Sequence, residues 1–223
     1  MRLPYSPLPL LVFIVALGLL LAIVQLGALT IAFDKLGLTP HSAFLLLFVS
    51  LFGSAVNLPL FSMTAESAPL PPAVPPALRR LLRQQAREFH GKTLVAVNVG
   101  GCLIPAAFSI YLLVREPLPW GPVLFAIALI AVVSRLISRP MPGIGIGMPM
   151  FVPPVIAATL ALLLDSEHSA PLAYISGTLG VIIGADLLRI PDIRKLGTPF
   201  ASIGGAGTFD GIFITGVVAV LLA

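Results

Sequence analysis

Charged side chains and cysteine are both scarce in this sequence. Only 10% of its 223 residues are charged, whereas a soluble domain carries about 25% charged residues. The single cysteine, Cys102, excludes an intrachain disulfide and a thiolate metal cluster, so we interpret it as a small packing residue. The histidines His41, His90 and His168 fall in three different expected loops. We therefore expect neither a metal nor a cofactor.

Apolar residues, in contrast, make up 58% of the chain. A water-soluble core of this size could not bury so much apolar surface, and a bilayer is the solvent that suits it. A spanning helix needs roughly 20 apolar residues, and we place such stretches at Leu8–Phe33, Ala43–Leu60, Thr93–Val114, Leu118–Leu136, Met148–Leu164, Ala170–Leu188 and Gly207–Ala223. The sequence therefore predicts an all-α, polytopic membrane helix bundle of about seven transmembrane helices, forming one domain over residues 1–223.

Nearly all lysines and arginines fall on one side of this expected topology. The exceptions are Lys35 and Arg115. Because short cytoplasmic loops carry an excess of Lys and Arg, we expect the N-terminus and the basic loops in the cytoplasm. An odd number of spans then puts Ala223 outside. The expected location is the cytoplasmic (inner) membrane, crossed several times.

The longest expected loop, about residues 62–92, has two chemically different halves. Its first half is rich in proline and predicts an extended linker. From Ala77 the second half predicts an amphipathic helix whose polar face carries Arg79, Arg80, Arg83 and Arg87. Such a helix is expected to lie on the anionic inner leaflet, with docking to a protein as the alternative. We expect no nucleic-acid partner, because no aromatic residues alternate with the arginines.

A second irregular stretch runs from Ser138 to Pro154 and is rich in glycine and proline. Such backbone can lie at membrane depth only where protein or a water-filled cavity satisfies its polar groups. It predicts either a re-entrant loop or a broken helix, which in transporters often marks a substrate site, or else an ordinary cytoplasmic loop.

Two aspartates lie inside expected spans, where a charge is costly and indicates function. Asp186 lies about one turn before the cytoplasmic end of its span, and Asp210 about one turn into the next. Two carboxyls at matching depth would share a proton and titrate as a unit, which suits either an aspartyl hydrolase or a proton or cation relay. Purely structural roles are the alternative: the helix dipole favours Asp210, and Asp186 could pair with Arg189.

Further polar and small residues are expected at the same depth. Asn57 ends one span and Asn98 begins the next, so both should face the cytoplasmic side. Around the aspartates they predict a polar pocket that also includes Gly184, Gly205, Gly207 and Thr208. Hydrogen bonding between helices without catalysis is the alternative for each asparagine. Asn98-Val99-Gly100-Gly101 and Ser202-Ile203-Gly204-Gly205 also echo one another weakly.

Four segments carry a resemblance to a known family: FGSAVNLPL, VAVNVGGCLIP, AYISGTLGVIIGADLLRI and SIGGAGTFDGIF. Over nearly its whole length the chain resembles an uncharacterised family of bacterial and archaeal membrane proteins, a domain of unknown function, which implies no established activity. More weakly it is similar to intramembrane aspartyl proteases, since Phe209-Asp210 looks like their Tyr-Asp and Gly184-Ala185-Asp186 like a reduced Gly-x-Gly-Asp. The two elements stand in reversed order, and Pro76-Ala77-Leu78 lies in the basic loop.

Three functional interpretations remain open from the sequence. The first is an aspartyl-type intramembrane hydrolase that uses Asp186 and Asp210. The second is a small proton-coupled permease or carrier that uses the same residues and the stretch Gly143–Gly147. The third is a scaffold without chemistry. The expected partners are the bilayer and an unknown membrane or small-molecule substrate.

Overall fold

The computed structural model describes residues 27–66, 91–141, 145–205 and 211–223. Helices dominate this part of the chain. The described α-helices are Gly27–Lys35, α2 (Pro40–Gly53), α4 (Ile104–Arg115), α5 (Trp120–Ile137), α6 (Val152–Leu164), α7 (Ser169–Val181) and α8 (Gly211–Leu222). Two π-helical turns, η1 (Val99–Leu103) and η2 (Ile182–Asp186), and a 3₁₀ segment, η3 (Leu187–Lys195), continue or precede them. The strands are β1 (Asn57–Thr64), β2 (Lys92–Asn98), β3 (Arg139–Met141), β4 (Gly145–Gly147) and β5 (Phe200–Ile203).

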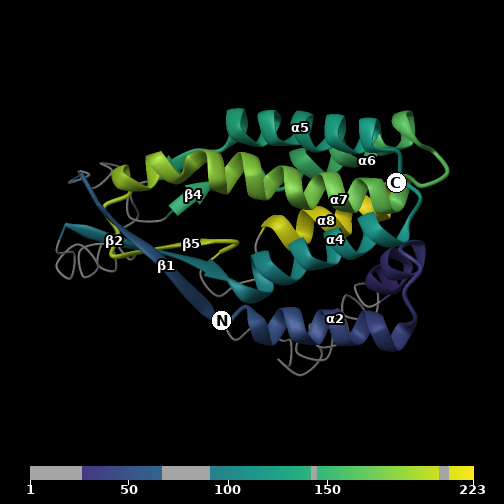
Figure 1. Ribbon diagram of the computed structural model, residues 1–223, viewed down its shortest axis with the longest axis horizontal. Helices are drawn as coiled ribbons and strands as arrows, with labels where there is room; N and C mark the ends of the chain where they lie inside the picture. The colour runs from purple at the N-terminus through teal and green to yellow at the C-terminus, as the bar shows by residue number, and fades with distance from the viewer. Residues whose placement is uncertain (1–26, 67–90, 142–144, 206–210) are drawn as a thin grey trace, which may run out of the picture.

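Helix α7 is the centre of the helical part, with α4, α5, α6 and α8 packed against it (Figure 1). All of its residues except Leu179 are buried. Its glycines let neighbours approach closely: a Cβ on Gly180 would lie 2.6 Å from the Cβ of Ile130 in α5. Small residues at helix contacts of this kind are typical of membrane helix packing.

The outer helices expose apolar side chains. Exposed apolar residues on α2, α4, α5 and α6 include Phe44, Phe52, Ile110, Val114, Leu124, Phe125, Leu136 and Leu163. Soluble monomers rarely present apolar surface on this scale. Among the described residues, α5 and the continuous helix Ser169–Lys195 are long and apolar enough to cross a membrane, and the pair Gly27–Lys35 and Pro40–Gly53, bent by 110°, is a third candidate. The larger number of about seven spans therefore remains a prediction.

A three-stranded sheet lies at one end of the helices (Figure 1). Its order is β1-β2-β5, with β1 and β2 antiparallel and β2 and β5 parallel. The chain is mostly helical, as expected, but it is not all-α: helix α2 ends at Gly53 instead of continuing to Leu60, and Lys92–Asn98 forms a strand where a span was expected to begin. The physical reason is that Pro59 cannot continue a helix and that a short buried strand is as apolar as a helix.

The breaker-rich stretch after α5 forms a second, two-stranded sheet. Arg139–Met141 pairs antiparallel with Gly145–Gly147, and α6 begins at Val152. The described residues of this stretch before α6 therefore do not form a broken helix, while the re-entrant loop stays a prediction. Gly145-Ile146-Gly147 is the partner strand of β3, and prolines at positions 140 and 142 disfavour a helix.

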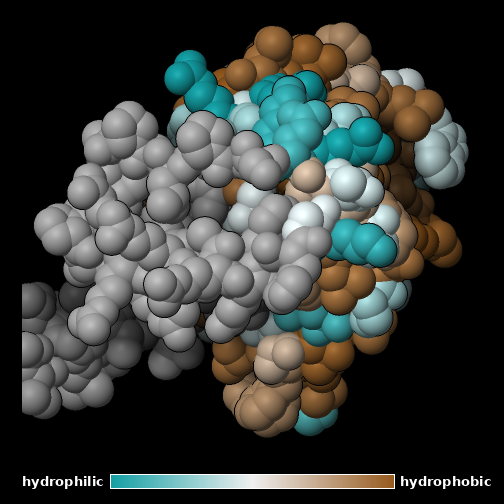
Figure 2. All heavy atoms as spheres, turned by 90° about the vertical axis from the view of Figure 1, so that its left-hand side faces the viewer, coloured by the Kyte–Doolittle hydropathy of each residue, from teal (hydrophilic) through white to brown (hydrophobic). Residues whose placement is uncertain are grey.

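Charge is distributed unequally between the two ends of the molecule. Six of the described basic residues belong to segments at the end that carries the strands: Lys92, Arg135, Arg139, Arg189, Arg194 and Lys195. Lys35 and Arg115 lie at the other end, where Lys35 Nζ reaches the carbonyl oxygen of Val220 at 3.4 Å and Arg115 Nη1 that of Gly37 at 3.1 Å. Figure 2 looks onto the strand end, where hydrophilic residues gather beside hydrophobic flanks. Lys35 and Arg115 are also the two exceptions in the charge distribution from which the orientation was predicted.

Candidate polar site at the strand end

The two asparagines predicted to face the same side meet in the structure. Asn98 is completely buried, and its Nδ2 donates to the carbonyl oxygen of Ser54 at 2.7 Å and to Oδ1 of Asn57 at 3.1 Å. Its Oδ1 accepts from the N–H of Gly101 at 2.7 Å and so caps η1. Asn57 Oδ1 also accepts from Ser202 Oγ at 2.6 Å. Both polar atoms of the Asn98 side chain are thus hydrogen-bonded, and these bonds connect the end of α2, the start of η1 and the sheet.

The weak sequence echo has a structural counterpart. Strands β2 and β5 are parallel neighbours, with Ala96 opposite Ser202, so both glycine pairs follow strands that end at the same edge. A Cβ on Gly101 would lie 2.0 Å from the carbonyl oxygen of Gly204. Gly204 and Gly205 have φ of 80° and 84°, where side chains are disfavoured. Backbone therefore touches backbone here, which only glycine permits.

Asp186 ends the π-helical turn η2 and lies beside this glycine contact. Its Oδ2 accepts a hydrogen bond from the N–H of Gly204 at 3.2 Å. The residue lines a cavity of about 180 Å³ together with Gly145, Leu196, Ser202 and Gly205. It also lines a second cavity, of about 240 Å³, with Met148, Val181 and Ile212. Since Ile146 belongs to both linings, the two cavities adjoin at Asp186. Single π-helical turns recur at functional sites.

The other predicted pocket residues have different positions. Gly205 lines the first cavity. Gly184 instead serves helix packing, since a Cβ there would lie 2.1 Å from the carbonyl oxygen of Ala131 in α5. Asp210, Gly207 and Thr208 lie outside the described residues, and so do Arg79, Arg80, Arg83 and Arg87. The aspartate pair and the membrane-surface helix therefore stay predictions.

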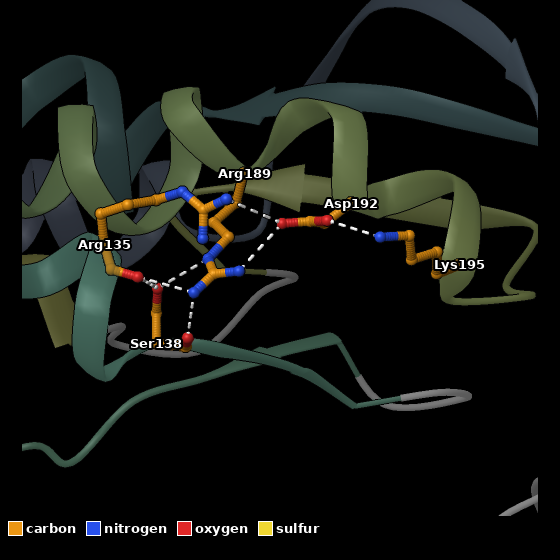
Figure 3. Close-up of polar contacts among 5 residues, drawn as sticks. All are labelled: Arg135, Ser138, Arg189, Asp192 and Lys195. Carbon is orange, nitrogen blue, oxygen red and sulfur yellow. Dashed lines mark hydrogen bonds and ion pairs between the residues drawn. The ribbon is translucent and has the colours of Figure 1, made fainter.

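A charged cluster, which the sequence interpretation missed, surrounds Arg189 next to this site (Figure 3). Arg189 Nη1 donates to Asp192 Oδ2 at 2.9 Å. Its other donors hold the end of α5: Nε reaches Ser138 Oγ at 3.0 Å, and Nη2 reaches the carbonyl oxygens of Arg135, at 2.6 Å, and Ser138. Arg189 therefore forms an ion pair with Asp192, whereas the structural alternative considered for Asp186 was a pair between Asp186 and Arg189.

Asp192 is the common anion of the cluster. Arg135 Nη2 lies 3.3 Å from its Oδ2, and Lys195 Nζ lies 3.1 Å from its Oδ1. The residue belongs to η3, beyond the apolar stretch that ends at Asp186. The hydrogen bond from Arg189 holds the pKa of Asp192 below its ordinary value of 3.8, helped by Lys195 and Arg135 against an opposing effect of burial. The spacing Arg189-x-x-Asp192-x-x-Lys195 is the sequence signal that could have revealed this cluster.

The described residues contain no group of three or more His, Cys, Asp or Glu side chains that could hold a metal ion. Fold and site together define a mostly helical chain with helices of membrane length and a polar, glycine-rich end. A family model described as protein of unknown function (DUF1614) matches residues 51–222, and the chain belongs to that family. No curated protein and no solved structure matches it. The resemblance to an uncharacterised family is thus confirmed, while the likeness to intramembrane proteases finds no support.

Proposed function

We propose that this chain is a multi-pass protein of the cytoplasmic membrane that works as a small proton-coupled carrier, exchanging a proton for a small cation at Asp186. The observation that carries the proposal is the place of the Asp186 carboxylate, which lines two adjoining cavities between η2, β4 and β5. The strand end, with its excess of basic residues, is the cytoplasmic end in this proposal.

The apolar outer surface supports the membrane part of the proposal. Residues such as Leu136 and Leu163, whose exposed fractions are 74% and 77%, would be costly in water and are favourable in lipid. Meanwhile the interior of the bundle holds α7, whose polar Ser176 and Thr178 are completely buried. Polar groups inside and apolar groups outside are what a bilayer requires.

The cavities support the carrier part over the hydrolase part. A carboxylate at the end of an apolar helix can bind either a proton or a cation, and such residues mark ion pathways in membrane proteins. Gly145, from the stretch that the carrier interpretation invoked, lines the same cavity as Asp186. A hydrolase would need a second carboxylate close to Asp186, whereas a carrier needs only the Asp186 carboxylate and its cavities.

The experiment uses inside-out membrane vesicles that contain the full chain, so that the proposed cytoplasmic end faces the bath. The vesicles are acidified inside, and NaCl, KCl, CaCl₂ or methylammonium chloride is added while a fluorescent pH indicator reports proton efflux. At least one of these cations should release protons in vesicles with the parent chain, and Asp186→Asn should abolish the response because the carboxylate is gone.

Glu167→Gln is the matched control, since Glu167 is exposed at the opposite end. This variant should keep the full response, and Asp186→Glu should keep part of it. No response of the parent chain to any of the cations, or an equal response of Asp186→Asn, would contradict the carrier proposal.

A further inference from the structure

Two cations of the charged cluster keep unused donors. The guanidinium of Arg189 donates hydrogen bonds to Asp192 and to three oxygens at the end of α5. Arg189 and Asp192 together are a neutral pair. Arg135 and Lys195 each make their one described side-chain contact with Asp192, on different oxygens of the same carboxylate. Their exposed fractions are 37% and 60%. Three cations thus share one carboxylate, so the cluster of described residues has a net charge of +2, and Arg135 and Lys195 approach Asp192 from opposite sides (Figure 3).

The surroundings of these two cations are apolar and exposed. Arg135 lies in the last turn of α5, next to Leu136, whose side chain is 74% exposed. Leu187 and Leu188, at the start of η3, are exposed as well. The long apolar run of α5 ends here. A ligand that contacts Arg135 thus meets the exposed Leu136 on the same turn of α5, and Leu188 is the residue before Arg189 in η3.

We propose that Arg135 and Lys195 bind the phosphate of an anionic phospholipid, whose acyl chains lie against Leu136 and Leu188. The phosphate oxygens accept hydrogen bonds from the remaining guanidinium donors of Arg135 and from the ammonium of Lys195, as charge-assisted pairs of this kind are strong. Asp192 sets the spacing of the two cations, and Arg189 fixes Asp192 to the end of α5. Basic pockets at the cytoplasmic ends of spanning helices recognise lipid headgroups in this way.

The lipid is the occupant because charge and apolar surface occur together. A free phosphate would use the two cations but leave the leucines unused, whereas a neutral lipid would use only the leucines. The proposal relies on the membrane placement proposed above but not on the carrier activity, so the two can fail separately.

The test measures lipid binding to the purified full chain in a neutral detergent by native mass spectrometry. Phosphatidylglycerol and phosphatidylcholine with identical acyl chains are titrated into the parent, into the double variant Arg135→Gln/Lys195→Gln, and into the control Lys92→Gln/Arg139→Gln. The control also removes two exposed cations from the strand end. Arg189 is left unchanged, so the end of α5 keeps its hydrogen bonds.

The parent and the control should both prefer phosphatidylglycerol. The Arg135/Lys195 variant should lose about 30-fold in affinity for it, since each basic residue near an anionic surface contributes roughly fivefold, while its binding of phosphatidylcholine stays unchanged. Equal losses in the two double variants would mean diffuse surface charge and overturn the proposal. Equal competition by glycerol 3-phosphate and by the lipid would overturn it too, because the site would then bind a soluble phosphate. Circular dichroism spectra that match the parent keep a folding defect from imitating the expected loss.

Discussion

The contact between Gly184 and α5 gives a sharp test of how the bundle is packed. Replacing Gly184 by alanine would put a Cβ 2.1 Å from the carbonyl oxygen of Ala131, and 2.8 Å from its carbonyl carbon. Ordinary contacts of a Cβ begin at about 3.4 Å, so the two helices would have to separate by roughly 1 Å. The obstacle is backbone, which cannot rotate away as a side chain can.

The expected cost follows from this geometry. Overpacking a well-filled interior destabilises by about 1–3 kcal/mol, and a backbone clash belongs at the upper end of that range. For a chain of this length, 1 kcal/mol lowers the melting temperature by roughly 2–4 °C. We therefore expect Gly184→Ala to melt about 6–10 °C below the parent chain in detergent.

Gly121 provides the control, because it lies in the first turn of α5 with nothing within 4 Å of an added Cβ. Gly121→Ala should leave the melting temperature unchanged or raise it slightly, since alanine is the better helix former. The measurement is tryptophan fluorescence or a thiol-independent dye during a thermal ramp. If both alanine variants melt together with the parent, the close approach of η2 to α5 is wrong.

Three further predictions concern the charged cluster and the orientation. Arg189→Gln should lower the free energy of unfolding by about 2–3 kcal/mol, because charge-assisted hydrogen bonds to the end of α5 are lost. The control Arg139→Gln, at an exposed position, should change it by less than about 0.5 kcal/mol. Chemical denaturation in mixed micelles measures both values. Because the pKa of Asp192 is depressed, its carboxylate stabilises the fold at pH above 3.8, and this stabilisation is lost as the pH falls below that value. Asp192→Asn should therefore melt at a lower temperature than the parent at pH 7, and the two melting temperatures should approach each other at pH 3. A difference in melting temperature that does not change with pH would contradict this prediction. In a Cys102→Ala background, a membrane-impermeant maleimide added to intact cells should label Glu167→Cys but not Arg139→Cys; the reverse pattern would invert the predicted orientation.

The sequence located the apolar helices well because long apolar runs have few alternatives. The expected spans Leu118–Leu136 and Ala170–Leu188 correspond closely to α5 and to α7 with η2. The wrong secondary-structure predictions fell on short apolar runs. Thr93–Asn98 is apolar enough for a helix, and only its β-branched residues and its partner β1, which is distant in the sequence, make it a strand. Pairing partners of that kind cannot be read from one segment alone.

The contacts of the candidate polar site were also beyond what a single sequence segment reveals. That Asn57 and Asn98 face one region could be predicted, since both stand at expected span ends. That they bond to each other through antiparallel strands depends on a register that no single segment specifies. The Arg189 cluster was missed because its charged residues lie beyond the expected end of the span at Leu188, where charge is common and does not by itself indicate a site. Its three charged partners are contributed by α5 and η3, which are distant in the sequence.

The strands also indicate where the membrane would end. Exposed sheet edges cannot lie in hydrocarbon, because their polar backbone groups would go unpaired, so the sheet must lie at the interface or in water. From Ser169, a helix reaches Asp186 after about 26 Å, at 1.5 Å per residue, which is slightly less than the roughly 30 Å of a hydrocarbon core. In the membrane placement proposed above, Asp186 would therefore lie at the inner boundary of the bilayer, with residues of β4 and β5 lining its first cavity. The proposed exchange of a proton for a cation would then start at a carboxylate that lines a cavity at the membrane boundary, which is a typical place for an ionisable group on an ion pathway to face.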